Sequence, residues 1–282
     1  MTEKDIFQNK NYLRDQQYKD SSNLDARANL HRLYSTSPLE WHRWVFAQLD
    51  LQPGMTVLEC GCGPGWLWRN NLDQIPENCQ ITLSDFSDGM VAEAAAALAD
   101  TGHDFRFQTV NIEAIPFADD SFDIVVANHM LYHVPNLAAG LAEVRRVLKE
   151  NGRFYTATNG ADHMRELKEL ALQFAPESTQ FEWPQLTFRL ENGRSLLSPP
   201  FAHIDLLPYE DSLEVTEVEP LMAYIQSMTL LQVIGRAEET ASPERTEGTV
   251  AILNQLRAYL TQEIAKNGSF HITKNSGLFT AY

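Results

Sequence analysis

A glycine turn that follows an acidic residue is the strongest chemical signal in the sequence. The segment VLECGCGPG, residues 57–65, runs from a hydrophobic strand ending near Glu59 into glycines at alternate positions, Gly61, Gly63 and Gly65. Glycine permits a tight turn and lets the backbone lie directly against a ligand. In an open parallel sheet, ligands bind at the carboxyl ends of the strands, where this turn falls. The pattern therefore predicts a ligand-binding site here.

This turn has two other interpretations. A dinucleotide-binding turn has the pattern Gly-x-Gly-x-x-Gly, but here the third glycine, Gly65, comes one position early and Trp66 occupies the expected place. An indole there would obstruct helix–strand packing and the approach of a pyrophosphate, which argues against an NAD-dependent oxidoreductase. A loop that needs glycine only for its geometry is the second alternative.

Three further motifs follow in order along the chain. Asp85 ends the next predicted strand, where a carboxylate can accept hydrogen bonds from both hydroxyls of a ribose. The segment NIEAIPF, residues 111–117, leaves the third predicted strand, and SFDIVVA, residues 121–127, enters the fourth. An acid that merely begins a helix is the plainer alternative for Asp85.

Together, these four motifs resemble those of the class I S-adenosylmethionine-dependent methyltransferases of the UbiE type, over about residues 50–160. The resemblance implies an enzyme that uses S-adenosyl-L-methionine as its cofactor. It also implies which residues bind that cofactor: Gly61, Gly63 and Gly65 along the methionyl part, Glu59 at the ammonium group, Asp85 at the ribose hydroxyls, Phe86 and Met90 beside the adenine, Asn111 and the backbone of Ile112 at the adenine edge, and Asn128 near the sulfonium. A methyltransferase-like binding protein without catalysis is the remaining alternative.

Two histidines follow the fourth predicted strand and are the candidate catalytic residues. His129 lies closest to the strand end and His133 follows four residues later. Histidine is suited to act as a base near neutral pH. Methyl transfer from a sulfonium is an in-line displacement, however, and positioning can supply much of its rate. A catalytic base and a structural histidine are therefore both open interpretations.

The segment before the first strand predicts a helical lead-in. Leu24, Arg27, His31 and Tyr34 recur at helical spacing and share one face. In the resembling enzymes such a lead-in folds over the cofactor as a lid, which implies cofactor contacts from Tyr18 and Arg27; a solvated Arg27 is equally open.

A second helix is predicted directly before the first strand. The segment Ser37-Pro38-Leu39-Glu40 predicts a helix start capped by Ser37. We expect Trp41 and Trp44 in the core of that helix rather than in a substrate cage.

These sites require alternating strands and helices to position them. The sequence predicts strands over 56–60, 81–85, 105–109, 122–127 and 153–157, separated by helices over 66–72, 87–99 and 137–148. We expect an α/β fold: a Rossmann-like, mainly parallel seven-stranded sheet with helices on both faces. After residue 160 the pattern predicts a helix over 162–174, an irregular insertion over 176–200, extended structure over 203–216, a long helix from 242 to 267 and a final hairpin over 270–273 and 278–282. One domain is expected over 1–282, divided into the lead-in (1–49), the cofactor-binding core (50–160) and a substrate-shaping part (161–282).

Composition limits the partners. The chain has 282 residues and a formal net charge of −16, so a phosphate backbone would be repelled and a nucleic-acid partner is not expected. The sequence shows neither a secretory signal nor an apolar run that could span a membrane, which predicts a cytoplasmic protein. Its three cysteines fit neither a disulfide framework nor a zinc site, and no metal is expected. We expect a small-molecule acceptor, neutral or cationic, methylated at oxygen before nitrogen and carbon; the sequence leaves the oligomeric state open.

Overall fold

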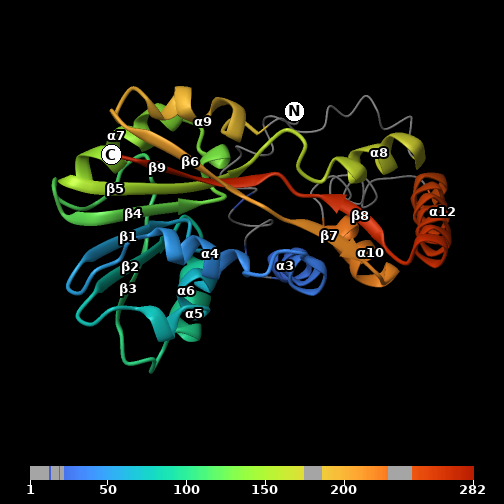
Figure 1. Cartoon of the computed structure of the whole chain (residues 1–282), viewed down its shortest axis with the longest axis horizontal. Coiled ribbons are helices and arrows are strands. Elements are labelled where there is room, and N and C mark those ends of the chain that lie inside the picture. The colour runs from blue at the N-terminus through green and yellow to red at the C-terminus, as the bar shows by residue number, and fades with distance from the viewer. Residues whose placement is uncertain (1–12, 14–18, 20–21, 175–185, 228–242) are drawn as a thin grey trace.

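The architecture is organised around a seven-stranded, mainly parallel sheet. The computed structural model describes residues 13, 19, 22–174, 186–227 and 243–282 (Figure 1). The sheet has the order β3-β2-β1-β4-β5-β9-β6, and β9 runs antiparallel to both of its neighbours. Its strands are β1 (Thr56–Cys60), β2 (Gln80–Asp85), β3 (Asp104–Thr109), β4 (Phe122–Asn128), β5 (Leu148–Asn159), β6 (Ile204–Tyr209) and β9 (Ser276–Ala281). This order confirms the predicted α/β fold and places the switch point between β1 and β4.

Helices cover both faces because the central strands are apolar on both sides. Along β4, Ile124 and Val126 pack into one buried cluster, whereas Val125 and Ala127 pack into another. The first face carries α4 (Trp41–Gln48), α5 (Trp66–Arg69) and α6 (Asp88–Ala97), and the second carries α7 (Leu137–Val147) and α9 (Leu190–Leu197). The 3₁₀ turns η2 (Leu72–Gln74) and η3 (Leu131–His133) connect core elements.

A second group of elements packs around its own buried cluster beyond the carboxyl edge of the sheet. It comprises α3 (Ser22–Tyr34), α8 (Arg165–Phe174), α10 (Val218–Ser227), α12 (Pro243–Asn267) and a two-stranded sheet of β7 (Ser212–Val215) and β8 (Phe270–Thr273). Two chain segments, β6–β7 and β8–β9, run from the central sheet into this group, as the orange and red strands of Figure 1 show. Within the described residues, no helix has the length and apolarity needed to cross a bilayer.

Several local predictions are confirmed. Ser87 caps α6 by accepting a hydrogen bond from the Met90 N–H at 3.4 Å, and Asn136 caps α7 through the Ala139 N–H at 3.1 Å. The long helix α12 ends at Asn267, and Gly268 follows it with a φ of 85°.

Three predictions about the fold are wrong, and one helix was not predicted. Ser37 does not cap α4; Glu40 does, because its carboxylate accepts from the N–H groups of His42 and Arg43. The segment 176–200 is not wholly irregular, since α9 lies within it, and α10 was not predicted. The final two strands do not form a hairpin, because β8 pairs with β7 whereas β9 inserts between β5 and β6. A short turn keeps two strands close in sequence, but each of these strands pairs instead with strands from earlier in the chain.

Candidate active site

One large cavity opens where the carboxyl ends of β1, β2 and β4 meet α3 and the segments β6–β7 and β8–β9. We call these two segments the ribbon of late strands. Its volume is about 1140 Å³, above the range of about 300–1,000 Å³ usual for a site that holds one small molecule. The residues predicted to bind the cofactor or to act on the methyl group line one continuous wall: Glu59, Gly61, Gly63, Asp85, Phe86, Met90, Asn111, Ile112, Asn128, His129 and His133. The cavity therefore has room for two ligands side by side.

The glycine turn lines the cavity at Gly61 and Gly63, where there is backbone and no side chain. Gly61 and Gly63 have φ values of 74° and 52°, a region that glycine occupies without strain. A Cβ on Gly61 would lie 2.8 Å from the side chain of Met130. Gly65 differs from the prediction, because it does not line the cavity: it begins α5 with a φ of 78°, and a Cβ there would approach Leu98 of the α6 layer at 3.1 Å. Gly65 therefore serves helix packing.

Glu59 is a buried carboxyl at the end of β1. Its side chain is 2% exposed, and Oε2 accepts a hydrogen bond from Nε1 of Trp68 at 2.7 Å. Burial raises the pKa of Glu59 to about 8, and the nearby carboxylate of Asp85 acts in the same direction. A cation placed against this carboxyl would favour its ionised form. The arrangement fits the predicted contact with an ammonium group, and Trp68 is the supporting residue that the sequence did not single out.

Asp85 is held firmly by the two turns beside it. Oδ2 accepts from the Gly63 N–H at 3.0 Å, and Oδ1 accepts from the Ser87 N–H at 2.9 Å. Burial raises the pKa of Asp85, and these backbone hydrogen bonds partly oppose the rise. Asp85 lines the cavity, and a carboxylate has about four sites at which it can accept a hydrogen bond. Asp85 can therefore still accept two ligand hydroxyls, as predicted.

The residues predicted to surround the adenine lie along the same wall. Met90 and Ile112 are buried, and Phe86 lines the cavity beside them. Asn111 already uses Oδ1 to accept from the Glu113 N–H at 3.2 Å, so a ligand amino group would have to share that oxygen. Nearer the centre, Oδ1 of Asn128 is buried and has no hydrogen-bond partner among the described residues. An unsatisfied buried acceptor is costly unless a ligand donor completes it, so the site fits a polar cofactor.

His129 stands between the two ends of the cavity. Its backbone N–H donates to Ala157 O at 2.9 Å, and its φ of 51° turns the chain out of β4. The imidazole centroid lies 5.1 Å from the ring of Trp41. Burial lowers the pKa of His129 to about 4, and its electrostatic interactions with His42 and Lys274 act in the same direction. His129 is therefore neutral near pH 7, able to accept a hydrogen bond but a weak base. His133 lies further along, in η3, against the ring of Tyr132 at 4.6 Å.

The far end of the cavity is formed by residues from widely separated segments. His31 of α3 lies 6.4 Å from His163 and 5.8 Å from Tyr224, measured between ring centroids. Trp41 lines the cavity and contacts Tyr209 at 5.0 Å, in addition to its place in the helix core, and Lys274 completes this end. The sequence prediction missed this set, apart from a general role for His31 in the lead-in. One signal was available: His163 follows β5 much as His129 follows β4, and the carboxyl ends of parallel strands meet at one edge.

The predicted lid contacts fall largely outside the described residues. Tyr18 lies outside them, and Arg27 belongs to α3 but its side chain is likewise outside the described part. Leu13, Leu24 and Ala28 of the lead-in do line the cavity, and the Leu24 side chain lies 3.9 Å from the place of a Cβ on Gly63, beside the glycine turn. The roles of Tyr18 and Arg27 remain predictions.

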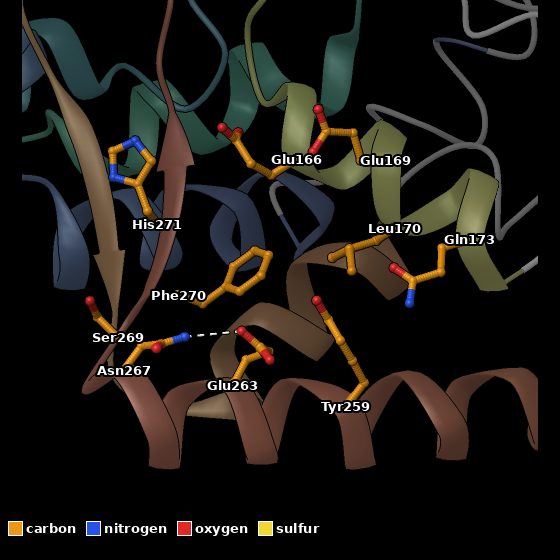
Figure 2. A pocket seen from close by; sticks show the side chains of 10 residues that line it. All are labelled: Glu166, Glu169, Leu170, Gln173, Tyr259, Glu263, Asn267, Ser269, Phe270 and His271. Carbon is orange, nitrogen blue, oxygen red and sulfur yellow. Dashed lines mark hydrogen bonds between the residues drawn. The ribbon is translucent and has the colours of Figure 1, made fainter.

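A second cavity of about 420 Å³ lies between α8, α12 and β8, away from the glycine turn (Figure 2). Glu166, Glu169 and Glu263 surround it, but two of these carboxylates already have partners. Glu166 accepts from the N–H and hydroxyl of Thr273 at 2.8 and 2.6 Å, and Glu263 accepts from Asn267 at 3.0 Å, as the dashed line shows. The contact of Glu166 ties α8 to β8, whereas that of Glu263 lies within α12.

Comparison with known proteins agrees with the geometry of the main cavity. Residues 58–156 match the model of a methyltransferase domain. A ubiquinone/menaquinone biosynthesis C-methyltransferase of Shewanella pealeana is 34% identical over 40% of this chain, a match that spans 46% of the relative's length. A demethylmenaquinone methyltransferase of Symbiobacterium thermophilum is 25% identical over 84% of this chain and 94% of the relative.

Solved structures resemble the chain in fold. The phosphoethanolamine N-methyltransferase 2 of Haemonchus contortus in complex with S-adenosyl-L-methionine aligns with a TM-score of 0.56 at 20% identity, covering 98% of this chain and 59% of that protein. At this identity the likeness concerns the fold. It extends over the late strands and helices as well as the central sheet.

Proposed function

We propose that this chain, a class I S-adenosylmethionine-dependent methyltransferase, transfers a methyl group to a small-molecule acceptor held at the far end of its cavity. The observation that carries the proposal is the single continuous cavity of about 1140 Å³, which joins the glycine turn and Asp85 to His31, His163 and Lys274. When bound, S-adenosyl-L-methionine supplies an electrophilic methyl group on its sulfonium. His129 and Asn128 lie where the two ends meet.

The residues at the cofactor end would bind and orient. Glu59 would ionise against the ammonium group and keep its hydrogen bond from Trp68. Asp85 would accept the ribose hydroxyls while Gly63 and Ser87 hold its carboxylate in place. Rigid placement of this kind lowers the entropic cost of reaching an in-line geometry.

His129 would act on the acceptor. Because its pKa is about 4, the ring is neutral and can accept the hydrogen of an acceptor hydroxyl. Its weakness as a base makes positioning its main contribution, with proton removal limited to acidic acceptors. His133 is the second candidate for this contact.

Oxygen is the acceptor atom that we place first, followed by nitrogen and then carbon. Carbon gains support from the two quinone-related methyltransferases that match the chain, one of which aligns over most of its length. The match at 34% identity covers 40% of this chain, and so bears less on the acceptor.

Titration and turnover test this function. Calorimetry should show binding of S-adenosylhomocysteine and no binding of NAD. Incubation with ¹³C-methyl-labelled S-adenosyl-L-methionine and a metabolite panel should then give labelled product, and the chemical shift of the transferred carbon identifies the acceptor atom. Binding of NAD without S-adenosylhomocysteine would overturn the cofactor site. Cofactor binding without turnover on any metabolite would argue against a small-molecule acceptor.

A further inference from the structure

A buried ion pair lies where the ribbon of late strands crosses from one sheet to the other. Lys274 stands between β8 and β9, and Asp211 stands opposite, between β6 and β7. Lys274 Nζ donates to Asp211 Oδ2, and the two side chains are 7% and 0% exposed. Charges as buried as these are retained only with compensating contacts, so their surroundings indicate what the pair does.

The two partners of this pair face different surroundings. Asp211 does not line the cavity, and its Oδ1 accepts from Ser35 Oγ at 2.8 Å and from the N–H groups of Thr36 and Ser37 at 3.0 Å. Lys274 does line the cavity, with Nζ 5.2 Å from the ring centroid of Tyr209. An ammonium group has three donors, and Asp211 is the one hydrogen-bond acceptor that Lys274 contacts among the described residues. The pair therefore presents its positive member to the cavity.

The histidines around Lys274 are neutral, so they add no further positive charge beside it. Burial lowers the pKa of His31 to about 3, and the charge of Lys274 adds to the effect; the pKa of His163 is lowered by the same two causes. Nδ1 of His163 accepts from the Asn275 N–H at 3.2 Å, so the proton of its neutral ring is on Nε2. Nδ1 of His31 is buried and has no partner among the described residues.

Glu40 also lines the cavity and interacts electrostatically with Lys274, but its carboxylate already accepts from the N–H groups of His42 and Arg43 at 2.8 and 3.1 Å. The far end thus offers one ammonium group, neutral hydrogen-bonding rings and a carboxylate that is engaged in capping α4.

We propose that Lys274 binds an anionic oxygen of the methyl acceptor, a carboxylate or an ionised hydroxyl, with His31 and His163 as neutral hydrogen-bond partners beside it. The aromatic rings of Trp41, Tyr209 and Tyr224 suit a planar body for such an acceptor. The inference rests on the proposed function and deepens it by naming the acceptor class. It replaces the expectation, based on overall charge, of a neutral or cationic acceptor: the chain is acidic as a whole, but a buried ammonium group lines this end of the cavity.

Three fluorinated probes of one shape and different charge test the inference. 4-Fluorobenzoate, 4-fluorobenzamide and 4-fluorobenzylamine are titrated into the full chain saturated with S-adenosylhomocysteine, and binding is followed by ¹⁹F NMR. We expect the benzoate to bind about tenfold or more tightly than the benzylamine, with the benzamide between them. Equal affinities, a preference for the benzylamine, or no binding of the benzoate would overturn the proposal.

Variants assign the preference to Lys274. Lys274→Gln should abolish it and Lys274→Arg should retain part of it. Because Lys274→Gln leaves Asp211 buried without its partner, the double variant Lys274→Gln/Asp211→Asn removes both charges and should show the same loss. Lys149→Gln is the matched control, since Lys149 also pairs with an aspartate, Asp123, at 2.8 Å, and does not line the cavity. A benzoate preference that survives in the double variant would contradict the role of Lys274.

The same experiment separates this inference from the proposed function. Binding of S-adenosylhomocysteine is measured first, by calorimetry, and depends on the Glu59 and Asp85 end of the cavity. Cofactor binding together with no charge preference would overturn the anionic acceptor and leave the methyltransferase site intact. Failure to bind S-adenosylhomocysteine would instead overturn the cofactor site on which the proposed function depends.

Discussion

The two ends of the main cavity are built in opposite ways. The cofactor end takes most of its residues from short segments that each leave a strand of the central sheet, and it holds two acids whose pKa values are raised, Glu59 and Asp85. The far end, which we call the acceptor end because we propose that the acceptor binds there, collects single residues from α3, two strand ends and the ribbon of late strands. Its histidines have lowered pKa values. Burial acts at both ends, but it raises the pKa values of acids at one end and lowers those of histidines at the other. The contrast suggests that the first end is prepared for a cation and the second for an anion or a neutral hydroxyl.

Replacing the residue between the two ends should have the largest effect. Asparagine is the suitable substitute for His129, because it tolerates the φ of 51° and removes the imidazole. If His129 accepts a proton or a hydrogen bond from the acceptor, His129→Asn should lower turnover by about 10²–10⁴-fold and leave affinity for S-adenosylhomocysteine nearly unchanged. Steady-state kinetics and calorimetry measure the two quantities.

The corresponding substitution His133→Asn is the control for this prediction, since His133 lines the same cavity further from the end of β4. We expect a smaller loss there. Cofactor affinity that collapses together with turnover in His129→Asn would show that His129 belongs to the cofactor end. A small loss of turnover would indicate an acceptor, such as a neutral amine, that needs no proton removed before attack.

The cofactor end could be predicted from the sequence because its signals are local. A glycine turn, a strand-terminal acid and a cap such as Ser87 are each specified within a few residues of sequence, and the apolar composition of the central strands predicts their positions. The main exception is Gly65, whose conformation was anticipated but whose neighbours, Leu98 and Ala94 of the α6 layer, were not. Local pattern specifies backbone shape better than it specifies what the shape contacts.

The acceptor end could not be predicted because its geometry depends on pairing over long separations. Lys274 was expected in the turn of a hairpin, where a lysine would be solvated. Instead β9 inserts between β5 and β6, and Lys274 meets Asp211 from a segment 63 residues earlier in the chain. Two strands close in sequence give no signal that each will pair with a different, distant strand. The positions of His31 and Tyr224 follow from that same topology.

Removing the charge of Asp85 should weaken cofactor binding by about 1.5–3 kcal/mol. Asp85→Asn loses the charged acceptor, and its amide group cannot accept from Gly63, Ser87 and a ribose together. Asp88→Asn is the matched control, because it removes the same charge from the first turn of α6 without lining the cavity. Calorimetry with S-adenosylhomocysteine measures both. Equal affinities in the two variants would place the ribose elsewhere.

Because the pKa shifts at the two ends are opposite, we expect one pH range in which the free energy of unfolding of the cofactor-free protein depends on the acids of the cofactor end and not on the histidines. Glu59 binds its proton more tightly when folded, with a pKa of about 8 against 4.5 for the ordinary group, so its stabilising contribution is complete below pH 4.5 and is lost as pH rises toward 8. The histidines act in the other sense: their lowered pKa values cost stability only as pH falls below 6.5. Between pH 6.5 and 8 the acids therefore act without opposition from these histidines.

Over that interval we expect the free energy of unfolding to fall as pH rises, by at most about 1.4 kcal/mol per pH unit for one such group. Glu59→Gln should reduce this fall, because glutamine can still accept the hydrogen bond from Trp68 but does not ionise. Glu150→Gln, at an exposed position, controls for the loss of one negative charge. Urea denaturation at pH 6.5 and pH 8 measures the difference. If the free energy of unfolding falls equally in Glu59→Gln and in the control, the buried acid does not titrate in this range. The contrast between the two ends would then rest on geometry alone.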